Sequence, residues 1–356
     1  LNQGNFDAPM ELSTNAQLEL QWWINNVETA HNTIYRPEPH ITMSTDASKK
    51  GWGCAIDRVK TGGLWTLEES KHHINYLELL AVYFGLKSHK SLVSHKHVKV
   101  LVDNTTVQIT LNKMGTSHSP VLNSFIKATW DWCIMNEVWL TVARIPGNEN
   151  IDADNESRKL RRTTEWCLNK QVFQSACDKF NVKPNIDLFA SRINYQVKPY
   201  MSYSPDPEAF AVNAFHHSWL GYNFYAFPPF CLISKVLQKI RKEESEGLVI
   251  LPKWTTQSWW PVAMKMLTRT PVILPRKTTT LFLPSNPLEK HPLHDKLILL
   301  MCHLSGNSSK TEAFRQQLLK SSKQHGEQVQ ESNMRDTWKN GDSIVVNGIW
   351  IPFRRL

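Results

Sequence analysis

The sequence lacks any long apolar run, and no stretch approaches the roughly 18 hydrophobic residues that a membrane-spanning helix needs. Its first ten residues, LNQGNFDAPM, do not show the basic and then hydrophobic pattern of a secretory leader. We therefore expect an intracellular protein, cytoplasmic or nuclear, without a membrane partner. Because the first residue is not Met, we also expect a piece of a longer polypeptide.

Cysteine is scarce, with six among 356 residues, and no two of them form a CxxC pair. Such scattered cysteines indicate neither a disulfide framework nor a structural zinc site. Histidines cluster at 72–73, 95–97 and 216–217, but none of these clusters has a cysteine at zinc-site spacing. Transition-metal chemistry is therefore not the expected function.

The composition is that of a globular protein, with 41% hydrophobic and 21% charged residues. A chain of 356 residues is too long for one ordinary core and suggests two or three domains. The 41 Lys and Arg residues outnumber the 32 Asp and Glu residues, which gives a formal net charge of +9. This excess is compatible with a polyanionic partner but does not identify one.

Hydrophobic periodicity divides the chain into four parts. Residues 12–27 have apolar side chains three or four positions apart behind a Thr14-x-x-Gln17 capping box, which predicts an amphipathic helix within a connecting segment, 1–40. We expect α/β domains at 41–165 and 166–285, and a partly disordered tail at 286–356.

The 41–165 part is expected to fold in the order βββ-α-β-α-β-α, a mixed α/β layer. Strands are expected at 41–47, 51–59, 62–67, 98–104 and 138–145, the third after a Thr61-Gly62-Gly63 turn. Helices are expected at 74–86 and 119–136, and a last helix follows the fifth strand. The 166–285 part has strand candidates at 186–191, 222–227 and 247–252 with a helix at 232–244, which favours a parallel sheet. A short helix is expected at 296–304.

Four acids of the 41–165 part stand where a charge is awkward: Asp46 and Asp103 at strand ends, Glu78 inside a helix, and Asp154 after a turn. Glu78 shares a helix face with Ile74, so its carboxylate is expected to point toward apolar neighbours. A buried carboxylate must raise its pKa or find a cation. We predict a shared Mg²⁺ or Mn²⁺ site, since hard cations prefer carboxylates, and paired ions can hydrolyse a phosphodiester.

Each acid also has an ordinary structural explanation when it is taken alone. Strand-end turns and helix N-termini commonly hold acids, which would account for Asp46, Asp103 and Asp154, and Glu78 would be a partly exposed helix residue. The joint pattern of four acids is what favours the metal site.

The motifs around these acids resemble the ribonuclease H domain attached to retroelement reverse transcriptases, and most of all the DIRS type, which encodes a tyrosine recombinase. The matching strings are STDASKKGWGCAI, NYLELLAV, VLVDNTTV and ARIPGNENIDADNESR, within about residues 41–160. The resemblance implies a ribonuclease H-like mixed five-stranded sheet with helices and two-metal cleavage of the RNA strand in RNA–DNA hybrids. It assigns catalysis and metal binding to Asp46, Glu78, Asp103 and Asp154, with Asp152 as the less favoured neighbour.

The resemblance also implies partners and substrate contacts. The partners are an RNA–DNA hybrid and an upstream reverse transcriptase domain of the same polyprotein, while the sequence itself has no YxDD polymerase motif. Ser48, Lys49, Asn104 and Arg144 are the candidate substrate-binding residues, because they flank the acids. Arg144 stands where relatives often carry His, and Arg cannot shuttle protons.

The 166–285 part resembles the Dam-type adenine methyltransferase segment of DIRS-type polyproteins, a Rossmann-like α/β domain. Its expected motif, Asn or Asp before Pro-Pro-Tyr or Pro-Pro-Phe, here reads Phe227-Pro228-Pro229-Phe230. Because Phe227 cannot hydrogen-bond a target amine, we expect a degenerate domain, with Asp187 as a candidate vestige of the S-adenosylmethionine site. The alternatives to a nuclease are a non-catalytic nucleic-acid-binding module, an adenine methyltransferase, and an integrase-like nuclease, against which the Glu78 motif argues.

Overall fold

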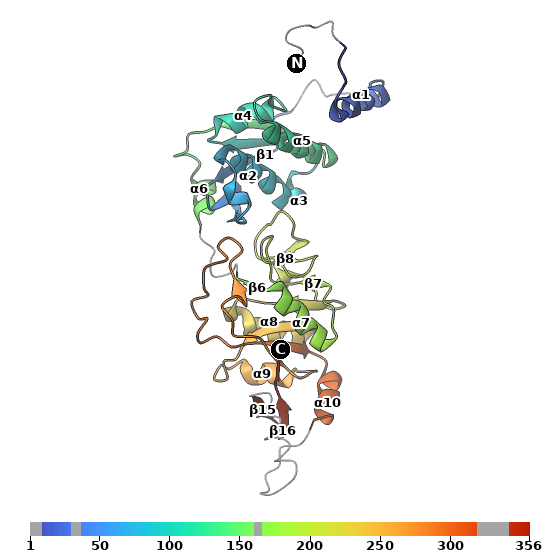
Figure 1. Cartoon of the computed structure of the whole chain (residues 1–356), viewed down its shortest axis with the longest axis vertical. Helices are drawn as coiled ribbons and strands as arrows, with labels where there is room; N and C mark the ends of the chain where they lie inside the picture. Colours follow the sequence, from blue (N-terminus) through green and yellow to red (C-terminus); the bar gives the residue numbers. More distant parts are fainter. Residues whose placement is uncertain (1–8, 30–36, 160–165, 319–341) are drawn as a thin grey trace. The chain divides into compact units, whose positions relative to one another are not determined.

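The computed structural model describes residues 9–29, 37–159, 166–318 and 342–356 (Figure 1). The chain divides into two compact units, Leu1–Glu38 and Pro39–Leu356. Helix α1 (Thr14–Asn26) is the only regular element among the described residues of the first unit. Among the described residues, no helix combines the length and the apolar character that crossing a membrane would require.

Helix α1 begins one residue earlier than the capping-box pattern predicts. Ser13 is the N-cap, and its Oγ accepts a hydrogen bond from the amide of Ala16. The Gln17 side chain donates to the carbonyl of Leu12, outside the helix. The cap is therefore a simple Ser cap, and the predicted reciprocal pairing with Thr14 is wrong.

The second unit contains the expected five-stranded mixed sheet, which confirms the fold class predicted for this part of the chain. The strand order is β3-β2-β1-β4-β5, with β1, β2 and β3 antiparallel and β1, β4 and β5 parallel. The strands are β1 (Ile41–Ala47), β2 (Gly51–Ile56), β3 (Val59–Leu64), β4 (His97–Val102) and β5 (Trp139–Arg144).

The turn between β2 and β3 lies earlier than predicted. The chain reverses at Asp57 and Arg58, where Asp57 has a left-handed φ of 51°. Gly62 and Gly63 lie inside β3, and a Cβ on Gly62 would come within 3.2 Å of the carbonyl oxygen of Glu156. Gly62 therefore allows α6 to approach β3 closely, and neither glycine forms the turn.

The helices of this part are α2 (Ile74–Ser88), α3 (Lys90–Val93), α4 (Thr105–Asn112), α5 (Pro120–Met135) and α6 (Ile151–Arg158), with a 3-10 turn at Glu69–Lys71. Helix α4 was not expected, because its TTVQITLN sequence is rich in β-branched residues, which favour strands. Asn104 overrides this preference, since its side chain accepts from the amide of Val107 and caps the helix.

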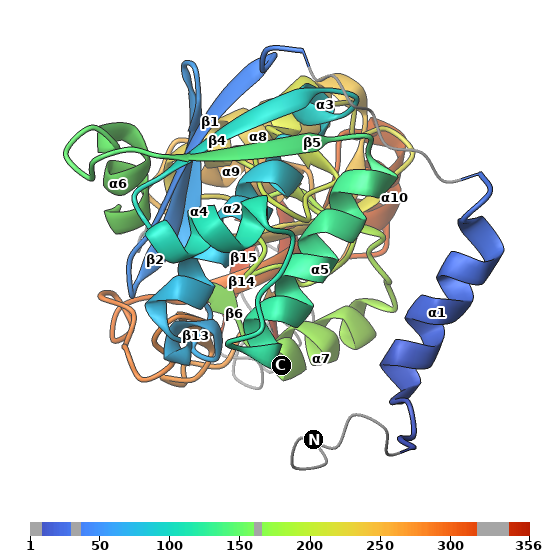
Figure 2. The ribbon, with the colours of Figure 1, turned by 90° about the horizontal axis from the view of Figure 1, so that it is seen from above.

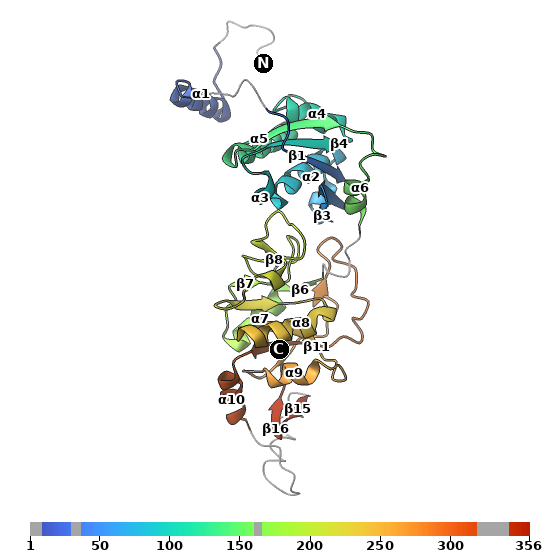
Figure 3. The ribbon, with the colours of Figure 1, turned by 180° about the vertical axis from the view of Figure 1, so that it is seen from behind.

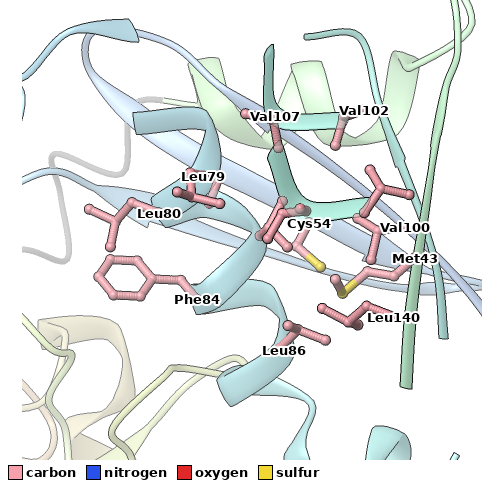
Figure 4. Close-up of a cluster of buried hydrophobic side chains, with 14 of the residues drawn as sticks. Met43, Cys54, Leu79, Leu80, Phe84, Leu86, Val100, Val102, Val107 and Leu140 are labelled. Atoms are coloured by element: carbon pink, nitrogen blue, oxygen red, sulfur yellow. The ribbon is translucent and has the colours of Figure 1, made fainter. Parts of the chain in front are cut away.

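Helices α2, α4 and α5 share one face of the sheet, and Figure 2 shows them together there. Their apolar side chains meet those of the strands in one core, in which Leu86, Val107, Met43 and Leu140 converge (Figure 4). Cys54 of β2 points into this core beside Gly85 of α2. Because side chains alternate along a strand, the neighbouring Gly53 faces the opposite side, where α6 packs.

Gly53 sets how closely α6 can approach β2. A Cβ at this position would clash with the carbonyl oxygen of Ala153 and lie 2.5 Å from the amide nitrogen of Ser157. Gly53→Ala should therefore push α6 outward and lower the free energy of unfolding by about 1–3 kcal/mol. Gly63→Ala is the matched control, because its Cβ would meet only the Trp52 ring, at 3.1 Å. Equal losses in urea unfolding for the two variants would contradict this interpretation.

A second sheet, of six strands, confirms the expected further α/β architecture. Its order is β17-β12-β14-β11-β10-β7, and β7, β10 and β11 are parallel. Its strands are β7 (Ile186–Asp187), β10 (Asn223–Ala226), β11 (Glu246–Pro252), β12 (Val272–Ile273), β14 (Leu299–Ser305) and β17 (Arg354–Arg355). The short pairs are β6 (Cys167–Leu168) with β13 (Leu281–Phe282), β8 (Met201–Ser202) with β9 (Ala211–Val212), and β15 (Ser343–Val346) with β16 (Ile349–Pro352).

Two helices cover opposite faces of this sheet (Figure 3). Helix α7 (Lys170–Phe180) packs with Leu248 and Ile250, whereas α8 (Ile233–Glu243) packs with Val249 and Leu251. Alternation along β11 thus gives each helix its own core. The remaining helices are α9 (Trp260–Lys265) and α10 (Ser308–Gln316), with 3-10 turns at Ala214–His216 and Phe230–Leu232.

The short helix predicted at 296–304 is wrong, because Leu299–Ser305 forms strand β14. All seven residues of β14 are buried, and the strand lies between β11 and β12, antiparallel to both. A strand covered on both faces has no polar alternation, so its run of apolar residues resembles a buried helix in sequence. The tail predicted to be partly disordered, 286–356, includes β14, α10 and β15–β17, whereas residues 319–341 lie outside the described residues.

One ion pair connects the two sheet regions within the second unit. The guanidinium of Arg192 binds both carboxylate oxygens of Glu69, at 2.7 and 2.9 Å, and lies 4.5 Å from the centre of the Phe84 ring. The pair is largely shielded, with 11% and 21% of the two side chains exposed. A bidentate, shielded pair of this kind restrains the two side chains more than a surface ion pair does.

Candidate metal centre

Three of the four predicted acids meet at one end of the first sheet. Asp46 belongs to β1, Glu78 to α2, and Asp103 follows β4 directly. One carboxylate oxygen from each lies within 4.8 Å of the others. Strand register explains the meeting of Asp46 and Asp103, because each stands two residues beyond the paired Ser44 and Leu101 of parallel neighbours.

Glu78 is the acid of this group whose ionised form is most disfavoured. Its residue is only 4% exposed, and its Oε2 has no hydrogen-bond partner. Burial raises the pKa of Glu78 to about 9, the negative charges of Asp46 and Asp103 add to this rise, and a backbone hydrogen bond with Ala47 opposes it. In the absence of a cation, this carboxyl group is therefore protonated at neutral pH.

Asp46 is also buried, with 5% of the residue exposed. Burial raises its pKa, a hydrogen bond from Ser157 lowers it, and the nearby charges of Asp103 and Asp154 raise it again. Desolvation and nearby negative charge thus disfavour the ionised forms of Asp46 and Glu78. Neither has a Lys or Arg ion pair among the described residues.

The donor set fits a hard divalent cation. Three carboxylates supply only oxygen ligands, and the unpartnered Oε2 of Glu78 is a buried acceptor that a cation would satisfy. Mg²⁺ and Mn²⁺ take carboxylate oxygens and keep several waters. Asp46, Glu78 and Asp103 are therefore the residues that would hold such an ion.

Asp154 lies outside this group of three. Its Oδ1 accepts a hydrogen bond from Nε of Arg158 at 2.6 Å, one turn later in α6. It is nevertheless close enough for its charge to raise the pKa of Asp46. Asp152, the neighbour that the sequence disfavoured, instead forms an ion pair with Lys60 at 2.6 Å.

Each of the four predicted substrate-binding residues has a contact within the protein. Ser48 Oγ donates to the carbonyl of Ser157 at 2.9 Å, and Lys49 Nζ donates to the carbonyl of His72 at 2.8 Å. Asn104 caps α4, and the Nε of Arg144 donates to the carbonyl of Asp103 at 3.3 Å. Arg144 thus contacts Asp103 and Asn104 follows it in the chain, whereas Lys49 contacts the segment before α2.

Sequence reasoning missed three polar residues at this end of the sheet. Ser157 Oγ donates to Oδ2 of Asp46, Asn150 Nδ2 donates to the carbonyl of Thr45, and Asn75 accepts from Nδ2 of Asn104. Asn75 stands three residues before Glu78 and so shares its helix face, which was a usable signal. Ser157 and Asn150 are in the closing motif, but their partners are about a hundred residues away in sequence.

The Phe227–Phe230 motif directly follows β10, and its rings pack together. The ring centres of Phe227 and Phe230 are 6.4 Å apart, and that of Phe230 is 5.0 Å from the Trp254 ring. Asp187 is 2% exposed, its oxygens accept from the amides of Phe189 and Gln196, and burial raises its pKa to about 7. Phe227 itself offers no side-chain donor or acceptor.

No family model and no curated protein matches this sequence. Among solved structures, ribonuclease H1 of the halophilic archaeon Halobacterium salinarum is 15% identical, with a TM-score of 0.28 over 33% of this chain and 96% of that one. LC11-RNase H1 in complex with an RNA/DNA hybrid is 18% identical, with a TM-score of 0.28 over 32% of this chain and 91% of that one. The foamy viral protease-reverse transcriptase in complex with an RNA/DNA hybrid is 12% identical, with a TM-score of 0.26 over 42% of this chain and 27% of that one.

Proposed function

We propose that this chain is a metal-dependent endoribonuclease that hydrolyses the RNA strand of RNA–DNA hybrids. The observation that carries the proposal is the convergence of Asp46, Glu78 and Asp103 within 4.8 Å at one end of a ribonuclease H-like sheet. Their motifs are those that resemble retroelement ribonuclease H domains, and the net charge of +9 suits a polyanionic substrate.

In this proposal the three carboxylates hold Mg²⁺ or Mn²⁺, and Asp154 on α6 completes the acidic set from nearby. A bound divalent ion activates water and stabilises the leaving oxygen of a phosphodiester. The protein's own contribution is to hold the acids in register on β1, α2 and β4 before substrate arrives.

Substrate contacts are proposed for Ser48, Lys49, Asn104 and Arg144. Lys49 and Arg144 supply positive charge beside the acids, where the phosphates of a bound strand would pass. Asn104, linked to Asn75 at 2.9 Å, offers a polar group of the kind that contacts sugar hydroxyls. The polyprotein context, with a reverse transcriptase domain before this chain, belongs to the same proposal.

The direct test is cleavage of a hybrid whose RNA strand is labelled, with the wild-type chain in Mg²⁺, in Mn²⁺, or in excess EDTA. We expect RNA fragments with either metal and intact RNA in EDTA, because the acids alone cannot activate water. Double-stranded DNA of the same sequence is the control and should remain uncut. Binding of the hybrid without any cleavage in metal would instead indicate a non-catalytic binding module.

A further inference from the structure

Ser157 connects the acidic cluster to α6. It lies near the end of α6 and is only 2% exposed. Its Oγ is 2.5 Å from Oδ2 of Asp46 and 2.9 Å from the carbonyl oxygen of Asp154. The hydroxyl therefore stands between one candidate metal ligand and the backbone of another candidate acid.

The position of Ser157 is held by the backbone around it. Its carbonyl accepts from Ser48 Oγ at 2.9 Å, two residues after Asp46. Its amide lies so close to Gly53 that a Cβ there would be 2.5 Å away. Because these contacts hold the backbone of Ser157, its hydroxyl could leave Asp46 only by rotation about χ1, which would also break its hydrogen bond with the Asp154 carbonyl.

A hydroxyl at this place limits how the Asp46 carboxylate can turn. The last torsion of an Asp side chain is broad, so an unrestrained carboxylate samples many orientations. The hydrogen bond from Ser157 Oγ to Oδ2 of Asp46 is charge-assisted. Because both oxygens turn about the same torsion, holding Oδ2 also fixes the direction of Oδ1. Neighbours that orient ligands in this way typically matter about 10- to 100-fold in metal affinity.

We propose that Ser157 is a positioning residue, which holds the Asp46 carboxylate in the orientation that binds the divalent cation and ties that orientation to the seating of α6. The inference rests on the proposed function. The proposed metal site then includes, beside the acids, a neutral residue whose hydroxyl influences the affinity for the ion.

The competing explanation is that the hydroxyl only satisfies the helix backbone, through its contact with the Asp154 carbonyl. Thr129 provides a matched control for this. It is fully buried in α5, and its Oγ1 donates to the carbonyl of Phe125 at 2.9 Å, a contact that involves no acid. Thr129→Val removes the same kind of helix contact and leaves the acidic cluster untouched.

The experiment measures Mn²⁺ binding by calorimetry for the wild type, Ser157→Ala and Thr129→Val in the full chain. We expect Ser157→Ala to weaken Mn²⁺ binding about tenfold or more, and Thr129→Val to leave it unchanged. In the cleavage assay, the Mn²⁺ concentration for half-maximal rate should rise by the same factor, whereas the rate at saturating Mn²⁺ should stay near that of the wild type. Melting in EDTA verifies that each variant is folded, and Ser157→Cys, a weaker donor, replaces the Ala variant if that one is not.

The outcomes separate the two proposals. The role of Ser157 would be overturned if Ser157→Ala bound Mn²⁺ within twofold of the wild-type affinity. It would also be overturned if Thr129→Val lost as much Mn²⁺ affinity as Ser157→Ala. Weakened binding in Ser157→Ala, together with a wild type that binds Mn²⁺ but cuts no hybrid, would support Ser157 and reject the nuclease. A wild type that binds no Mn²⁺ would reject both.

Discussion

Asp103→Asn is expected to reduce hybrid cleavage by about a thousandfold or more, since several kcal/mol of transition-state stabilisation depend on the bound metal. Asp103 supplies one of the three oxygens within 4.8 Å, and Asn keeps its shape but removes the charge that attracts the cation. Single-turnover cleavage of labelled hybrid at fixed Mg²⁺ measures the effect. Hybrid affinity, measured in Ca²⁺ or EDTA, should change much less, because phosphate contacts come mainly from basic groups.

Asp152→Asn is the matched control for this prediction. Asp152 also belongs to the acidic motif, but it is half-exposed and paired with Lys60 at 2.6 Å. Losing an exposed ion pair costs little, so cleavage by Asp152→Asn should stay within about threefold of the wild type. If Asp103→Asn cuts the hybrid at a rate comparable to that of Asp152→Asn, the three-acid cluster is not the catalytic centre.

The first sheet could be predicted from sequence because its signals are local. Apolar runs marked the strands, and the predicted run 119–136 contains α5, which begins at Pro120 behind its Ser119 cap. Helix α4 and strand β14 were missed for opposite reasons. Helix α4 has strand-type residues that the Asn104 cap holds in a helix. Strand β14 is an apolar run buried on both faces, so it lacks the two-residue alternation that marks a strand.

The meeting of Asp46, Glu78 and Asp103 was predicted because each acid stands at a recognisable point of its own element. The contacts that support them could not be predicted in this way. Ser157 reaches Asp46 across 111 residues, and Arg192 reaches Glu69 across 123. Neither pair produces a periodic pattern in the sequence, since a single side-chain contact depends on how whole helices and strands pack.

Replacing Glu78 with a side chain that does not titrate is expected to stabilise the metal-free protein above neutral pH. The pKa of Glu78 is raised by burial to about 9, from an ordinary 4.5 that the unfolded chain retains. Between these values the folded state holds a proton that the unfolded state has lost, so the contribution present below pH 4.5 is lost as pH rises toward 9. The loss is at most about 1.4 kcal/mol per pH unit. Glu78→Gln lacks this titration, so in EDTA it should match the wild type near pH 5 and exceed it by about 2–4 kcal/mol near pH 8.

Urea unfolding in EDTA from pH 5 to 9 measures this effect, and the difference between the two proteins is the quantity to follow. Asp187, whose pKa burial raises to about 7, adds a slope of the same sign to both proteins, and subtraction removes it. Glu68→Gln, a change at a side chain that is 78% exposed, should leave the wild-type profile unaltered. Added Mn²⁺ should reverse the order near pH 8, because the cation binds the ionised Glu78 of the folded wild type and meets a neutral amide at this position in the variant. A Glu78→Gln profile parallel to the wild type would mean that folding does not raise the pKa of Glu78, and the electrostatic description of this site would then be wrong.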